Sequence, residues 1–122
     1  MAGLEAKTFD SPDETRPFED GKGQVEVVNI GGGSVLYGTF EPGWRWSEHV
    51  KPLAGTDSCQ SPHFLYVLSG RMKLAMDDGT EAEIGPNSVA RIDPGHDAWV
   101  VGDEACKSID FGPSPTYAKP QG

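Results

Sequence analysis

The sequence has no run of about 18 apolar residues, which is the length that a membrane-spanning helix needs. Its N-terminus also lacks a basic region followed by an apolar segment, the pattern of a secretory signal peptide. Cysteine is scarce as well, because only Cys59 and Cys106 are present and they stand far apart. We therefore expect a cytoplasmic protein with reduced thiols and no membrane partner.

Basic residues are also few, with 10 Lys and Arg against 19 Asp and Glu, which gives a formal net charge of −9. A field of this sign repels nucleic-acid phosphates and anionic lipid headgroups. We therefore expect no nucleic-acid partner.

No segment shows a sustained helical period of apolar residues. The 16 glycines and 10 prolines instead favour many tight turns. Short runs rich in β-branched and apolar residues lie between these turns, which is typical of antiparallel sandwiches, jelly rolls and closed barrels. The predicted strands are residues 25–30, 34–41, 63–70, 71–78, 80–84, 88–93, 98–101 and 106–111.

The chain length of 122 residues suits one domain. Residues 1–24 carry prolines, glycines and charges without periodicity, and we interpret them as an extended N-terminal arm. Residues 25–115 form the predicted β-barrel, and residues 116–122 a C-terminal tail.

A first motif follows the second predicted strand. Gly43 and His49 are separated by five residues, and Lys51 follows two residues after the histidine. Further on, six residues separate His63 from Gly70. This pattern resembles the first motif of the cupin family, which has a second histidine at the place of Lys51 and a glutamate at the place of His63.

A second motif lies around the Pro94-Gly95 turn. Aligned on Gly95, the cupin pattern puts Asn87 at a glycine, Asp93 at a proline and Ala98 at a histidine. His96 stands two residues before Ala98. Because side chains in a strand alternate with period two, His96 can share a face with position 98 and replace the missing ligand.

The resemblance implies an all-β fold, the double-stranded β-helix or cupin jelly-roll barrel, with the extended N-terminal arm added to it. It also implies one divalent metal ion, and a homodimer, since small cupins are commonly dimeric. Cupin chemistry ranges over dioxygenases, isomerases, lyases, epimerases and non-enzymatic binders, so the fold does not name a reaction.

All three histidines of the chain, His49, His63 and His96, fall within the two motifs, and we predict that they are metal ligands. Imidazole suits zinc, iron, nickel, copper and also manganese sites, which the sequence does not distinguish. Cys59 is a candidate fourth ligand that would favour zinc; Asp57 competes for this role. The alternatives are unrelated histidines and a loop cysteine that only packs.

Trp44 and Trp46 alternate with Arg45 and Ser47 in front of His49. If this segment is a strand with His49 inward, then Arg45 and Ser47 also face inward and are candidate substrate-binding residues. The two tryptophans would face outward and pack against a second subunit or the arm, or belong to an ordinary core on the back of the sheet.

Arg91 lies in the predicted strand 88–93 and is a third candidate for substrate binding, through a bidentate contact with a carboxylate. The alternative is an exposed arginine paired with one of the many acids. No general base stands out, because the parity of Glu48 and Asp97 points them away from the site. The catalytic residues therefore stay unknown.

The sequence predicts a metal-binding cupin that acts on or binds a small polar or carboxylate-bearing molecule. It could be a metal-dependent enzyme of the dioxygenase, isomerase or lyase type. The alternatives are a non-catalytic binding or sensing module and a dimeric scaffold with a vestigial site.

Overall fold

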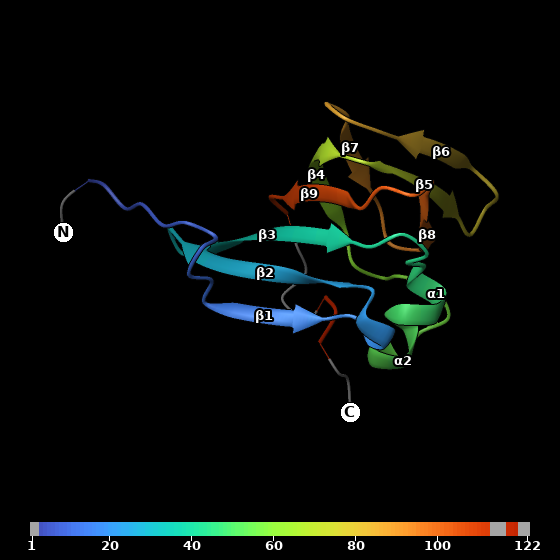
Figure 1. Ribbon diagram of the computed structural model, residues 1–122, viewed down its shortest axis with the longest axis horizontal. Coiled ribbons are helices and arrows are strands. Elements are labelled where there is room, and N and C mark those ends of the chain that lie inside the picture. The colour runs from blue at the N-terminus through green and yellow to red at the C-terminus, as the bar shows by residue number, and fades with distance from the viewer. Residues whose placement is uncertain (1–2, 113–116, 120–122) are drawn as a thin grey trace.

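The computed structural model describes residues 3–112 and 117–119, and these form two antiparallel β-sheets with a few short helices (Figure 1). The larger sheet has the strand order β1-β2-β3-β9-β4-β7, and the smaller has the order β6-β5-β8. The all-β class and the jelly-roll barrel predicted from the sequence are confirmed. The elements are β1 Glu14–Pro17, η1 Glu19–Gly21, β2 Gly23–Ile30, β3 Gly33–Phe40, α1 Trp46–His49, α2 Lys51–Ala54, β4 His63–Ser69, β5 Arg71–Met76, β6 Glu81–Ile84, β7 Val89–Ile92, β8 His96–Val101 and β9 Cys106–Asp110.

Strand β4 shows how the sequence sets the two faces of the larger sheet. Leu65 and Val67 are buried, at 9% and 0% exposure, whereas Phe64 and Leu68 are exposed at 54% and 41%. This is the period-two alternation of a strand that covers a core on one side only. The parity of β4 also places His63 on the buried face.

Gly70 joins β4 to β5 at a place that only glycine fits. Its φ is +76°, and a Cβ there would lie 2.3 Å from the carbonyl oxygen of Ala105. The chain thus passes from one sheet to the other while staying in close contact with the start of β9. Because β4 and β5 belong to different sheets, this crossing places the two sheets on either side of one core.

The core lies between the two sheets and is continuous. Each fully buried aliphatic or aromatic side chain contributes roughly 1.5–3 kcal/mol relative to its exposed state. The core residues come from most of the strands and from the segment around α1. They include Val25, Val27, Leu36, Phe40, Trp44, Trp46, Val50, Leu65, Val67, Met72, Leu74, Ile84, Ile92, Ala98, Val100 and Cys106.

The segment before and within α1 differs from the predicted strand. Arg45 is extended and makes a single bridge with Trp99, and a helix then begins at Trp46. Because the strand stops at Trp46, its parity cannot be counted back from His49, and Trp44 and Trp46 both lie inward, where each is only 2% exposed. The expectation of outward-facing tryptophans at a subunit interface is therefore wrong, whereas Trp44 does pack against Phe18 of the predicted arm, with ring centroids 5.4 Å apart.

The predicted arm, residues 1–24, contains regular structure in its second half. Strand β1 pairs with β2 along the edge of the larger sheet, and η1 follows it. Residues 3–10 lie at the end of the sheet where β2 turns into β3 (Figure 1): the Gly31 N–H donates a hydrogen bond of 3.1 Å to Glu5, and the Phe9 ring is 5.4 Å from that of Tyr37. The predicted tail, residues 116–122, is described only at 117–119, where the Tyr117 carbonyl accepts a hydrogen bond of 2.9 Å from Arg16.

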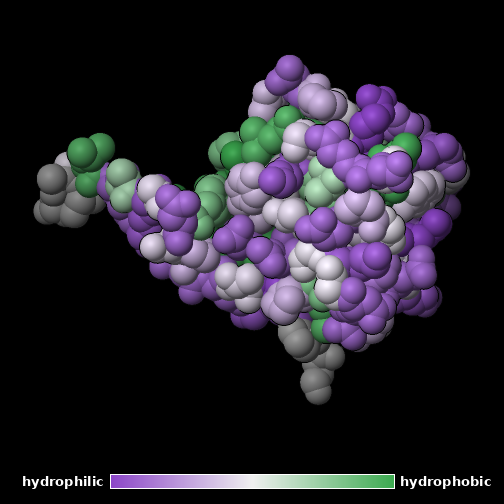
Figure 2. All heavy atoms as spheres, viewed as in Figure 1, coloured by the Kyte–Doolittle hydropathy of each residue, from purple (hydrophilic) through white to green (hydrophobic). Residues whose placement is uncertain are grey.

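The surface is largely hydrophilic, but apolar side chains gather over β4 and the end of β9 (Figure 2). In the part of the chain that the structure describes, no helix has both the length and the apolar character needed to span a bilayer. The large exposed apolar residues in this region are Phe64, Leu68, Val89 and Phe111.

Candidate metal centre

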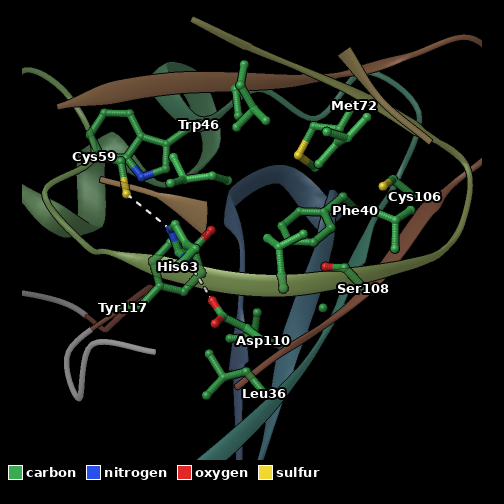
Figure 3. Close-up of a pocket in the computed structure, with 18 of the residues that line it drawn as sticks. Leu36, Phe40, Trp46, Cys59, His63, Met72, Cys106, Ser108, Asp110 and Tyr117 are labelled. Atoms are coloured by element: carbon green, nitrogen blue, oxygen red, sulfur yellow. Dashed lines mark hydrogen bonds and ion pairs between the residues drawn. The ribbon is translucent and has the colours of Figure 1, made fainter. Parts of the chain in front are cut away.

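A cavity of about 40 Å³ lies inside the core between the two sheets. Aliphatic and aromatic side chains form most of its wall. The polar side chains lie mainly toward one end, where Cys59, His63, Asp110 and Tyr117 come together near Trp46 (Figure 3). This polar end contains the candidate metal centre.

His63 is the first residue of β4, and β9 provides its partner. The imidazole Nδ1 donates a hydrogen bond of 2.5 Å to Oδ2 of Asp110. The other oxygen, Oδ1, accepts bonds of 3.1 and 3.0 Å from the backbone N–H groups of Phe64 and Gly112. The two backbone N–H groups hold this buried carboxylate in place, and the carboxylate in turn holds Nδ1 of His63. The opposite ring nitrogen, Nε2, therefore faces the cavity.

His96 begins β8 and is oriented in a similar way by the backbone. Its Nδ1 donates a hydrogen bond of 2.8 Å to the carbonyl oxygen of Asp93. A carbonyl can only accept, so the proton of a neutral His96 sits on Nδ1 and Nε2 keeps its lone pair. The rings of His63 and His96 are 5.3 Å apart between centroids.

Cys59 reaches this cluster from the loop between α2 and β4. A backbone bridge joins it to His96, with the Cys59 N–H bonded to the His96 carbonyl at 2.7 Å. The Sγ atom lies 3.7 Å from Nε2 of His63. The ligand atoms of Cys59, His63 and His96 all lie within 4.8 Å of one another, and all three residues are buried.

The electrostatics favour a thiolate. Burial raises the pKa of the Cys59 thiol, but hydrogen bonds and charge from the imidazoles of His63 and His96 outweigh it and lower the pKa to about 6. Burial lowers the pKa of His63, whereas its hydrogen bonds to Asp110 and Cys59 and their negative charges raise it to about 9.

The donor set fits a divalent metal ion. A thiolate and two imidazoles are ligands that zinc prefers, and typical bond lengths put tetrahedral zinc donors roughly 3.4–3.6 Å apart. The Cys59–His63 distance of 3.7 Å is close to this range. Both histidines also donate their Nδ1–H to oxygen, as metal-ligating histidines usually do. Three donors leave a position free in a four-coordinate shell.

Comparison with solved structures decides the fold family. A structural-genomics protein of unknown function from Rhizobium leguminosarum has a TM-score of 0.62 and 17% identity, with 98% of this chain and 100% of that chain covered. A sugar phosphate isomerase of the cupin superfamily from Silicibacter pomeroyi has a TM-score of 0.59 and 20% identity over 87% and 73% of the two chains. The chain has the cupin fold.

A third solved structure, the iron(II) form of HppE, has a TM-score of 0.61 at 11% identity, covering 89% of this chain and 60% of that one. No family model matches the sequence. No curated protein sequence matches it either. Because the sequence identities are low, these neighbours show the cupin fold alone. The chemistry of this barrel has to be argued from its own residues.

His49, the third predicted histidine ligand, lies elsewhere in the cupin barrel. It belongs to α1 instead of a strand, and its Nδ1 accepts a hydrogen bond of 2.9 Å from the backbone N–H of Arg45. Its Nε2 lies 3.9 Å from a carboxylate oxygen of Asp20. The helical turn that begins at Trp46 directs His49 away from the strand face on which the motif would place it. In the part of the chain that the structure describes, His49 is not in the cluster of Cys59, His63 and His96.

The three predicted substrate-binding residues do not line the cavity. Arg45 lies over the Trp99 ring at 4.3 Å and forms an ion pair of 3.3 Å with Asp97. Ser47 accepts a hydrogen bond from Arg45. Arg91 is exposed and pairs with Asp93, which was the alternative considered for it.

Asp57, which competed with Cys59 for the fourth ligand, is also outside the cluster, since its side chain is fully exposed and 4.0 Å from Lys51. Sequence reasoning missed Asp110, Tyr117 and Trp46. A signal for Asp110 exists, because it shares strand parity with two other buried residues of β9, Cys106 and Ser108.

Proposed function

We propose that this cupin barrel binds one divalent metal ion per chain through Cys59, His63 and His96. The observation that carries the proposal is the convergence of three buried donor atoms within 4.8 Å of one another. The hydrogen bonds at both Nδ1 atoms support it, because they leave the Nε2 lone pairs for a metal. Zinc is favoured by the thiolate, which is a soft ligand.

The bound metal serves to hold a small polar or carboxylate-bearing molecule. A zinc ion with three protein ligands keeps a position for water or substrate and acts as a Lewis acid there. Neighbours of the same fold include an iron(II) protein and a sugar phosphate isomerase, which supports the use of such barrels for small-molecule chemistry. A reduced Cys59 thiol suits the cytoplasm, our proposed location.

A non-catalytic binding or sensing role is the second candidate. Its support is Cys59 itself, because a thiolate ligand is typical of sites that hold a metal without oxygen chemistry. The cavity beside it is small, at about 40 Å³. A catalytic role requires turnover of a substrate by the zinc-loaded protein.

Elemental analysis after dialysis tests the metal site. We expect about one zinc per chain in the native protein, and His63→Ala and His96→Ala should each fall well below one because each loses a ligand. His49→Ala is the matched control, as it removes a buried histidine outside the cluster, and it should keep its metal. Full occupancy in His63→Ala would refute the site.

We also propose a homodimer, with a second copy of this chain as the partner. The exposed apolar residues Phe64, Val89 and Phe111 lie on or beside β4, β7 and β9, and β7 is an edge strand of its sheet. An apolar edge is a ready template for pairing with its own copy. Light scattering at micromolar concentration should give a dimer mass, and Val89→Lys should lower it; a native monomer refutes the proposal.

A further inference from the structure

The indole of Trp46 is a buried polar group near the metal cluster that has no partner among the described residues. Trp46 is 2% exposed and lines the cavity. Its Nε1 is buried and has no hydrogen-bond partner among the described residues. An unpaired buried N–H costs about 1–3 kcal/mol, so a native protein normally supplies an acceptor for it.

The position of this indole relates it to the metal cluster. In Figure 3, Trp46 lies at the same end of the cavity as Cys59 and His63, with its nitrogen on the side toward them. The donor set leaves one coordination position for a ligand from outside the chain. A ligand atom bound there can therefore also accept the hydrogen bond that the indole offers.

The walls restrict the ligand further. Among the described lining residues there is no lysine or arginine, so the metal would be the positive charge that a ligand meets there. A divalent ion with one thiolate and two neutral imidazoles carries a net charge of +1, which attracts an anion. The Asp110 carboxylate is the other nearby charge, and three N–H donors already bind it.

Cavity size allows a compact ligand. The cavity measures about 40 Å³, which is more than the roughly 10–15 Å³ that a single water occupies. It therefore has room for a small molecule such as formate.

We propose that the metal centre takes a compact oxygen anion, of the size of formate, and that the Trp46 Nε1–H donates a hydrogen bond to it and so selects for oxygen acceptors. This rests on the metal site proposed above. Trp46 is a positioning and specificity-determining residue in this arrangement, while Cys59, His63 and His96 bind the metal.

Trp44 offers a matched control. It is equally buried, lines the same cavity and has an unpaired Nε1. Its ring, however, packs against aromatic neighbours, with centroids 5.4 Å from Phe18 and 4.6 Å from Phe40. Trp44→Phe and Trp46→Phe delete the same atoms from the same core, and only the second removes the proposed donor.

The experiment uses the full chain loaded with cobalt(II), whose visible absorption responds to ligand exchange, titrated with sodium formate. We expect formate to bind, and Trp46→Phe to weaken binding at least about tenfold, as loss of a hydrogen bond to a charged group predicts. Trp44→Phe should bind formate within about twofold of the native protein. Cobalt content should be equal in all three proteins.

A second measurement needs no variant at residue 46. In the ¹⁵N-labelled zinc protein the three tryptophans give three indole N–H signals, assigned with Trp44→Phe and Trp99→Phe. The Trp46 signal should shift downfield on addition of formate, and the other two should not. Equal weakening in both phenylalanine variants, an unshifted Trp46 signal, or a cobalt protein that binds no formate would each overturn the inference while leaving the metal site intact. Failure to bind cobalt would overturn both.

Discussion

The two cysteines of the chain line one cavity, yet their surroundings differ in almost every respect. Cys59 lies beside His63 and Trp46 (Figure 3). Cys106 is the first residue of β9 and lies at the other end of the cavity, beside Met72 and Phe40 (Figure 3). The pKa of Cys59 is lowered to about 6 by its imidazole partners, against the effect of burial.

Cys106 shows what burial does without such partners. Desolvation, followed by the nearby charge of Glu104, raises the pKa of its thiol to about 11. The same side chain is therefore the proposed metal ligand at one end of the cavity and a small core residue at the other. The positions of the imidazoles, and not the presence of a thiol, decide where the chemistry lies.

Serine replacement gives the largest contrast between the two ends. Cys59→Ser replaces a thiolate ligand by a neutral hydroxyl, and we expect zinc affinity to fall by more than about 100-fold, beyond the loss typical of a change outside the ligand shell. Cys106→Ser should keep its zinc but lose about 1–3 kcal/mol in free energy of unfolding, because it buries a hydroxyl among apolar groups.

Competition with a chelator measures the zinc affinities, and urea unfolding of the metal-free proteins measures stability. Equal zinc affinity in the two serine variants would mean that Cys59 is not a ligand. In that case the contrast between the two ends would reduce to a difference in packing.

Asp110→Asn tests whether the Asp110 carboxylate supports metal binding through His63. The amide cannot accept from His63 with the strength of a carboxylate, so the imidazole loses its fixed orientation and basicity. We expect zinc affinity to fall roughly 10–100-fold. Ser108→Ala, also on the buried face of β9, serves as the control and should change zinc affinity little. An unchanged affinity in Asp110→Asn would separate Asp110 from the metal.

Thiol alkylation of the metal-free protein sharpens the comparison with a smaller effect. Because the pKa of Cys59 is about 6, its thiolate fraction is high at pH 7, and it falls about tenfold at pH 5. The alkylation rate should fall with it, while Cys106, with a pKa of about 11, stays protonated and slow at both pH values. Mass spectrometry of peptides follows each cysteine separately, and zinc should protect Cys59; faster labelling of Cys106 would contradict the pKa order.

The fold could be predicted because it depends on local signals repeated along the chain. Runs such as 63–69 and 106–110 alternate buried and exposed residues, and turns such as the one at Gly70 separate them. The structure has strands at each of these predicted places. The segment from Trp44 to His49 misled the same reasoning, because alternation there continues across the start of a helix.

The site was less accessible from sequence, because tertiary contacts assemble it. The structure brings His63, His96 and Cys59 together, three residues that the motifs and spacing had singled out. It leaves His49 out, since one helical turn redirects it. The role of Asp110 depends on the pairing of β9 with β4, which no local pattern encodes.

The backbone bridge between Cys59 and His96 holds residue 59 in place independently of its side chain. Main-chain hydrogen bonds position residue 59 beside residue 96, with the N–H of Cys59 and the N–H of Gly95 each bonded at 2.7 Å across the bridge. None of these bonds depends on the side chain at 59. A single substitution there can thus replace sulfur by nitrogen or oxygen without rebuilding the loop, and the preferred metal would change with it. The backbone around residue 59 thus stays the same, while the side chain there sets which metal the proposed site prefers.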